Sequence, residues 1–301
     1  MHSKEIDMNQ NNNNRIKYIA WIFLPCILAF ILQYIATIVV MEGKVVYAMG
    51  TFKGSTVDEL MDYMFDIMLS AATDGSIYVL YAVVGVAVFV TCYNKMFMKG
   101  KSYSLKGISK NVPLTLVGLT LFCIGMQYIS LFLMNALAVA FPSWMEEYEN
   151  IIESAGLTDE ITVLMAVYAV LLGPIIEEFI FRGITYSAAR KIMPYYLAIF
   201  VQALLFGAFH LNAIQGCYAF VLGLGLGYIM YLYDNIFLTI AAHIIYNIVG
   251  TFFSEALPIA EDTVFTLFFS VLFALLVTYG SLICLKNGAA SVKDEASFTD
   301  I

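Results

Sequence analysis

The chain has 301 residues, of which 61% are hydrophobic and 13% are charged, and its formal net charge is −8. A soluble domain is about half apolar and about a quarter charged, so this composition excludes a soluble protein and indicates a polytopic membrane protein. The negative charge gives no indication of a nucleic-acid partner, and the five cysteines show no paired spacing that would suggest a disulfide framework or a cysteine zinc site.

Eight apolar runs of about 20 residues, the length that a membrane-spanning helix needs, follow one another along the chain. The first is longer than the apolar part of a signal peptide and lacks a small-residue cleavage site, so we expect it to be retained. The expected fold is all-α, a polytopic membrane bundle of about eight transmembrane helices. The runs cover residues 17–41, 76–97, 113–140, 162–188, 194–211, 215–233, 236–256 and 264–285.

The connections between these runs alternate in charge. Lysines gather between the second and third runs, and Arg190 and Lys191 lie between the fourth and fifth, whereas acidic residues dominate the connections after the first, third and seventh runs. Lysine and arginine prefer the cytoplasmic side of a membrane, so both termini are expected to be cytoplasmic, which an even number of spans also requires. Residues 57–69 have apolar residues at helical spacing with acidic residues between them, which predicts a short amphipathic helix at the outer surface.

Composition divides the chain into four parts. Residues 1–15 are polar and rich in asparagine, and we expect them to form a disordered tail. Residues 16–141 are expected to form a three-helix membrane region with the outer amphipathic segment. Residues 160–256 contain the polar motifs described next, and residues 257–301 hold the last span and a cytoplasmic tail.

Two adjacent carboxylates and an arginine lie inside the fourth apolar run, in the sequence from Gly173 to Gly183. Ionisable side chains at bilayer depth cost several kcal/mol each, so they usually mark a functional site. Glu178 and Arg182 are four residues apart, which predicts a pair on one helix face. Glu177 points about 100° away and is left for chemistry. A cluster that only holds helices together is the structural alternative.

Two of the three histidines of the chain also lie in apolar runs. His210 is in the fifth run, and His243 is in the seventh with Asn247 one turn later on the same face. Counted from the inner loops at 1.5 Å per residue, Glu177 is about 20 Å deep, His210 about 25 Å and His243 about 10 Å. All three are within the hydrocarbon, but helix tilt or shifted helix starts must close the gap between them. Glycines in the sixth run would allow close helix packing.

A glutamate, two histidines and an asparagine suit hydrolysis of an amide by an activated water. Glu177 would act as the general base, His210 would hold the water and help with proton transfer, and His243 and Asn247 would donate to the oxyanion. A serine or cysteine nucleophile motif is absent from the sequence. Two alternatives remain open, a zinc site formed by Glu177, His210 and His243 and a membrane scaffold or proton-relay transporter without peptidase activity.

These residues form three motifs that resemble the CAAX protease and bacteriocin-processing family, also called the CPBP or Abi family. The motifs are Glu-Glu-x-x-x-Arg at Glu177, Phe-x-x-x-His at Phe206 and His-x-x-x-Asn at His243, in order and on successive runs. The resemblance covers residues 160–255. It implies an intramembrane glutamic endopeptidase in which Glu177 and His210 activate water and His243 and Asn247 form the oxyanion hole. Glu178, Arg182 and Phe206 would support the site.

The expected partners are membrane lipid and a peptide or protein substrate, with or without a lipid anchor. The expected location is a bacterial plasma membrane, in which the chain is an integral multi-pass protein. The resemblance calls for no cofactor, although zinc remains the alternative noted above. Because bacterial members of the family are linked to bacteriocin immunity and to roles not clearly proteolytic, a catalytically silent immunity factor is the alternative function.

Overall fold

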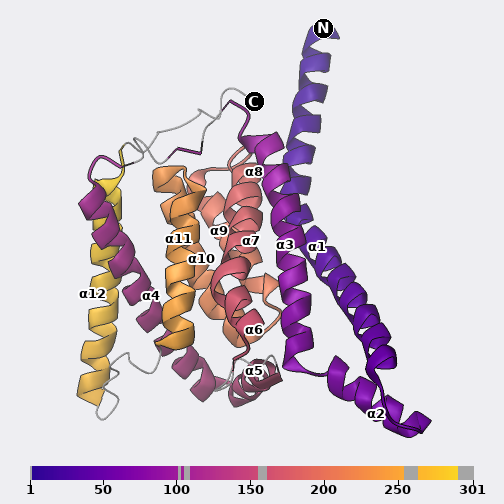
Figure 1. Ribbon diagram of the computed structural model, residues 1–301. Coiled ribbons are helices and arrows are strands. Elements are labelled where there is room, and N and C mark those ends of the chain that lie inside the picture. Colours follow the sequence, from indigo (N-terminus) through magenta and orange to yellow (C-terminus); the bar gives the residue numbers. More distant parts are fainter. Residues whose placement is uncertain (1, 101–102, 105–108, 155–160, 254–263, 291–301) are drawn as a thin grey trace.

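The computed structural model describes residues 2–100, 103–104, 109–154, 161–253 and 264–290, and this part of the chain is helical, with no strand beyond one isolated bridge between Ser109 and Ala289. Figure 1 shows the helices side by side in a bundle, with the start of the first helix and the end of the last at the same end. The helices are α1 (His2–Thr51), α2 (Val57–Met68), α3 (Ala71–Phe97), α4 (Val112–Ala140), α5 (Pro142–Ser154), α6 (Val163–Val167), α7 (Gly173–Glu178), α8 (Ser187–Ala189), α9 (Tyr195–Phe209), α10 (Ala213–Tyr233), α11 (Ile236–Phe252) and α12 (Val264–Gly288), with two π-helical segments, η1 (Tyr168–Leu172) and η2 (Phe179–Tyr186).

The expected all-α membrane architecture is confirmed, with six helical segments long and apolar enough to cross a membrane. Two of the eight predicted spans correspond to shorter apolar helices, α9 with 15 residues and α11 with 17. At 1.5 Å per residue α9 is about 22 Å long, less than the ~30 Å of a hydrocarbon core. A count of eight full spans and the cytoplasmic side of the termini therefore stay predictions.

Two segments, residues 2–15 and 142–154, are helical in the structure. Helix α1 begins at His2, so the segment expected to be a disordered tail continues the first helix. Extending an existing helix costs far less than starting one, because only the first turn fixes several residues for a single hydrogen bond. The acidic connection at residues 142–154 was expected to be a loop but forms α5.

Helix α2 forms where the apolar spacing predicted it. Its N-terminus is a capping box, in which the Thr56 hydroxyl accepts from the Glu59 N–H and the Glu59 carboxylate accepts from the N–H groups of Ser55 and Thr56. These main-chain donors lower the pKa of Glu59. The box gives α2 a fixed start after the turn that follows α1.

The predicted fourth span is not one regular α-helix. Regular turns in α6 and α7 alternate with the wider turns of η1 and η2. The break before α7 follows from Pro174, which has no N–H and whose ring clashes with the carbonyl four residues earlier. Gly173 donates instead to the Tyr168 carbonyl five residues back, the π-helical pattern. The six residues of α7, which include both adjacent glutamates, are thus set between two π-helical segments.

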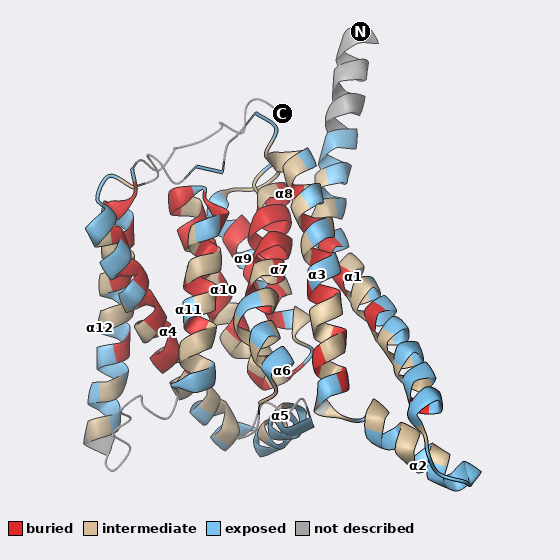
Figure 2. Cartoon of the chain, in the orientation of Figure 1, coloured by how far each residue is buried: buried red, intermediate tan, exposed pale blue. Residues whose placement is uncertain are grey.

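Burial is greatest in the middle of the bundle. Figure 2 shows buried residues concentrated on α7, the segment that follows it, and the facing sides of α9, α10 and α11, whereas α2, α5 and α12 are largely exposed. All eight residues of η2 are buried, and Arg182 within it is among the largest fully buried side chains. The charged motif therefore lies in the interior of the bundle.

Helices α9 and α10 form a tightly packed hairpin because small residues meet along their contact. A Cβ atom on Gly207 would lie 2.5 Å from the Gly216 carbonyl oxygen, and one on Gly223 would lie 3.0 Å from the Cα of Ala203. Only glycine allows the two backbones to approach this closely. The close packing fixes the end of α9, where His210 lies.

We expect Gly207→Ala to destabilise the protein by about 1–3 kcal/mol, because the added methyl group forces α9 away from α10. The measurement is thermal unfolding of the detergent-solubilised protein. Gly280→Ala in α12 is the matched control, because a Cβ there meets nothing within 4 Å and alanine is favoured over glycine in helices by about 1 kcal/mol. Equal stability of the two variants would contradict the close packing described here.

Candidate active site

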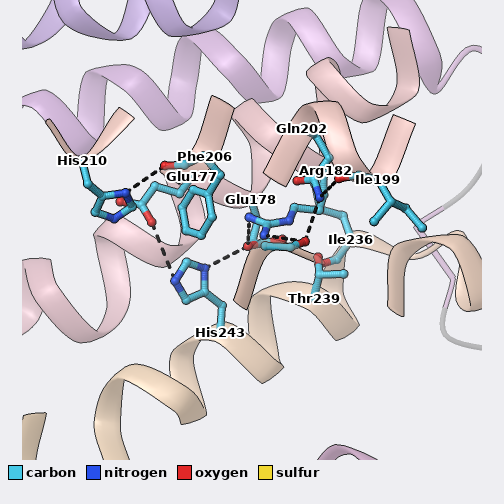
Figure 3. Close-up of polar contacts among 11 residues, drawn as sticks. Glu177, Glu178, Arg182, Ile199, Gln202, Phe206, His210, Ile236, Thr239 and His243 are labelled. Atoms are coloured by element: carbon cyan, nitrogen blue, oxygen red, sulfur yellow. Dashed lines mark hydrogen bonds and ion pairs between the residues drawn. The ribbon is translucent and has the colours of Figure 1, made fainter. Parts of the chain in front are cut away.

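Glu178, Arg182 and His243 form a fully buried polar cluster. One carboxylate oxygen of Glu178 lies 2.8 Å from Arg182 Nη1 and 2.9 Å from His243 Nδ1. The side chains of Glu178 and Arg182 are 0% exposed and that of His243 is 3% exposed. An ionised carboxylate beside an arginine only accepts hydrogen bonds, so His243 carries a proton on Nδ1 and donates it to Glu178. Figure 3 shows Glu178 between these two partners.

Arg182 has two further contacts in this interior. Its guanidinium carbon lies 4.5 Å from the centre of the Phe206 ring, a cation–π contact, and its Nη2 donates to the Gly223 carbonyl at 3.4 Å. Buried charges are tolerated only when they are paired and hydrogen-bonded. Arg182 therefore connects three helical segments, its own, α9 and α10.

Glu177 has a different environment although it is next to Glu178. Its side chain keeps 13% of its surface exposed, and the Nε2 atom of His243 lies 3.7 Å from its carboxylate, too far for a hydrogen bond. His243 thus lies between the two carboxylates, bound to Glu178 through Nδ1 and facing Glu177 with Nε2. One glutamate is held by strong partners, and the other retains free acceptor capacity.

His210 ends α9 and is only partly buried. Its Nδ1 lies 2.9 Å from the Phe206 carbonyl oxygen, which can only accept, so Nδ1 carries the proton and Nε2 is left as an acceptor in the neutral ring. The Phe206 ring meets both imidazoles edge to face, at 5.0 Å from His210 and 5.7 Å from His243. Figure 3 shows the His210 ring and the Glu177 carboxyl group on the same side of the cluster.

The turn after His210 has an unusual backbone. Leu211 has φ 54°, in the left-handed region that is costly for residues other than glycine, and its side chain is 75% exposed. Asn212 then starts α10 by accepting the Gln215 N–H with its side-chain oxygen. Backbone strain of this kind is concentrated at functional sites. This turn could not be predicted from the sequence, because leucine is not a typical turn residue.

Asn247 has a partner that the sequence did not suggest. Its Nδ2 donates to the Ala169 carbonyl oxygen at 2.8 Å. In the π-helical pattern of η1 this carbonyl would accept from residue 174, but Pro174 has no N–H to donate. The Asn247 side chain therefore satisfies an acceptor that the proline leaves free, which uses one of its two amide hydrogens.

A shifted helix start closes the gap in depth between His243 and the glutamates, since Nε2 of His243 lies 3.7 Å from Glu177 and Nδ1 lies 2.9 Å from Glu178. The depths estimated from the sequence assumed that all the inner loops lie at the same depth in the membrane. Gly183 faces Ile236, since a Cβ atom added to Gly183 would lie 3.2 Å from the Ile236 side chain. The connection before α11 thus lies level with Gly183, seven residues short of Arg190, and His243 needs only two turns of α11 to reach the glutamates.

Gln202 is a buried polar residue that the motif analysis did not select. It is 0% exposed, and its Nε2 donates to the carbonyl oxygens of Ile199 at 2.9 Å and Gly223 at 2.7 Å. A signal was available, since an amide side chain in an apolar run one turn before Phe206 lies on the same helix face. Gln202 shares the Gly223 carbonyl with Arg182 and so stabilises the α9–α10 contact beside the cluster.

A metal centre was the alternative for Glu177, His210 and His243. Among the described residues, no group of three histidine, cysteine, aspartate or glutamate side chains has the arrangement of a metal site. Both ring nitrogens of His243 face carboxylates rather than a shared point with His210. Metal-free catalysis remains a proposal that a chelator experiment can test.

Comparison with known proteins adds an independent finding for the segment that contains these residues. Residues 159–249 match the family model described as Rce1-like, type II CAAX prenyl endopeptidase. A search of curated proteins and a search of solved structures give no match. The matched residues include the two glutamates, both histidines and Asn247, and exclude the first three predicted spans. The match covers the segment that carries the three motifs, and it supports their resemblance to the CAAX protease (CPBP) family.

Proposed function

We propose that this protein is an intramembrane endopeptidase in which Glu177 activates a water molecule to hydrolyse a peptide bond. The observation that carries the proposal is the contrast between the adjacent glutamates. Glu178 is neutralised by Arg182 and His243 within 2.9 Å, whereas Glu177 is partly exposed and has no hydrogen bond to them. A carboxylate with free acceptor capacity beside two histidines is suited to take a proton from water.

The reaction proceeds in two steps. Glu177 takes a proton from the water while the water oxygen bonds to the peptide carbonyl carbon, which leaves a negative charge on the carbonyl oxygen. This intermediate then collapses, the carbon–nitrogen bond breaks, and Glu177 returns the proton to the departing amine. His210 presents its free Nε2 to the water, and its Nδ1 bond to the Phe206 carbonyl fixes the ring.

The oxyanion donors are assigned to His243 and Asn247, as the family resemblance implies. His243 donates through Nδ1 to Glu178, so Nε2 can donate to an oxyanion only when the ring is a cation. The two carboxylates that face the ring favour that state, whereas the nearby Arg182 opposes it. Asn247 has its second amide hydrogen available, because the first is used on Ala169.

The substrate class follows from the environment of the site and from the family description. The segment is surrounded by helices apolar enough to cross a membrane, so we propose a peptide or protein substrate that is associated with the membrane. The matched family is described as acting on CAAX prenyl proteins. A prenylated C-terminal peptide is therefore the first substrate to test, with an unlipidated peptide as the comparison.

The experiment uses the full-length protein in phospholipid vesicles. A farnesylated peptide with a fluorophore and a quencher on either side of the cleavable bond reports hydrolysis, and the same peptide without farnesyl tests the need for a lipid. We expect wild-type protein to cleave the probe and His210→Ala to lose about 100-fold or more in rate. Equal rates for the two proteins would contradict the proposal. An unchanged rate after chelator treatment would count against the zinc alternative.

A further inference from the structure

Tyr81 on α3 has a buried hydroxyl group with no hydrogen-bond partner among the described residues. The residue is 2% exposed. It lies in the N-terminal region, outside the segment that matches the family model. A buried hydroxyl without a partner has given up its hydrogen bonds to water without replacement, so such groups are rare and call for an explanation. Phenylalanine would fill the same space without this cost.

The packing of α3 directs this part of the helix toward the two glutamates. Helix α3 runs in the same direction as the broken fourth span, with Gly75 against Leu164 and, ten residues later, Gly85 against Ile176. Tyr81 lies one turn before Gly85 on the same face, and Ile176 directly precedes Glu177. Tyr81 therefore lies on the face of α3 that packs against the segment carrying Glu177.

The hydrogen-bond donors that the three motifs place near Glu177 are each engaged at least once. His210 Nδ1 is engaged by the Phe206 carbonyl, His243 Nδ1 by Glu178 and Asn247 Nδ2 by Ala169. Oxyanion stabilisation needs a donor that is fixed in place and not already used. Among the described residues around Glu177, the Tyr81 hydroxyl is a buried donor without a partner.

We propose that Tyr81 is a further catalytic residue, whose hydroxyl donates a hydrogen bond to the carbonyl oxygen of the substrate as that oxygen becomes negatively charged. The proposal rests on the hydrolysis assigned to Glu177 above and adds a donor from α3. It also gives the N-terminal region a role in the site, since α3 would complete a reaction centre otherwise built from the family segment.

The test is Tyr81→Phe, which removes only the hydroxyl. Loss of one oxyanion donor lowers kcat by about 100- to 1000-fold, and we expect KM to change little, because the hydrogen bond forms mainly in the transition state. Thermal stability in detergent should stay the same or rise, because the removed group had no partner. Tyr78→Phe is the control, because Tyr78 is on α3 like Tyr81 but stacks on Tyr168, with the two ring centres 4.7 Å apart. We expect this variant to keep wild-type activity.

Measuring both kcat and thermal stability distinguishes a failure of the Tyr81 proposal from a failure of the proposed function. Wild-type kcat in Tyr81→Phe would overturn the proposal, and so would a fall in stability, which would show that the hydroxyl has a structural partner. If wild-type protein cleaves neither the farnesylated nor the unlipidated probe, the proposed function fails for these substrates. The stability comparison between Tyr81→Phe and wild type would still decide whether the hydroxyl is structural.

Discussion

Glu178→Gln is expected to destabilise the protein by about 3–5 kcal/mol, the usual cost of breaking a buried ion pair by removing one partner. The glutamine has nearly the same shape, so no cavity is formed. The substitution leaves the fully buried Arg182 without its carboxylate at 2.8 Å and weakens the hold on His243. Thermal or chemical unfolding in detergent measures the loss, and a low yield of folded protein in the membrane is its cellular counterpart.

The double variant Glu178→Gln with Arg182→Gln is the control for this prediction. Removing both charges also removes the uncompensated arginine, so the double variant should be more stable than the sum of the two single losses. Losses that simply add would show that Glu178 and Arg182 do not act as a pair. Wild-type stability of the single Glu178→Gln variant would contradict the structural role assigned to this carboxylate.

Glu177→Gln is expected to give the opposite result, a loss of hydrolysis by about 100- to 10,000-fold with little change in stability. A positioned general base contributes a rate factor of this size, which corresponds to about 3–5 kcal/mol of transition-state stabilisation. Stability should hold because the Glu177 side chain is partly exposed and lies 3.7 Å from His243 Nε2, too far for a hydrogen bond. The measurements are kcat/KM on the farnesylated probe and the unfolding midpoint of the same preparation.

Glu177→Asp is the matched variant, since it keeps the carboxylate and shortens its reach. We expect an intermediate rate, because the base is present but displaced from the water. Full activity of Glu177→Gln would show that this carboxylate does not take the proton. A loss of stability as large as that of Glu178→Gln would show that Glu177 is also a structural residue, as in a scaffold whose motifs hold the helices together.

The sequence by itself determined the membrane class, the helical architecture and the identity of the charged residues and histidines in the interior. Composition and the length of the apolar runs are sufficient for these, because a helix in lipid must satisfy its own backbone hydrogen bonds. The Glu178–Arg182 contact also follows from spacing alone, since residues four apart lie on one face, and the structure has it at 2.8 Å. The glycines that allow close packing of α10 are likewise recognisable in the sequence.

Only the tertiary structure decided how these residues are connected. His243 is bound to Glu178 through Nδ1 and faces Glu177 with Nε2, because the start of α11 lies level with Gly183. Asn247 is bound to the Ala169 carbonyl because Pro174 leaves that acceptor free in a π-helical turn, and a regular 3.6-residue period does not foresee such turns. Tyr81 comes near Glu177 through the packing of α3, a contact between segments almost 100 residues apart. Spacing along one helix predicts contacts within that helix, whereas contacts between helices depend on where each one starts and how closely the backbones approach.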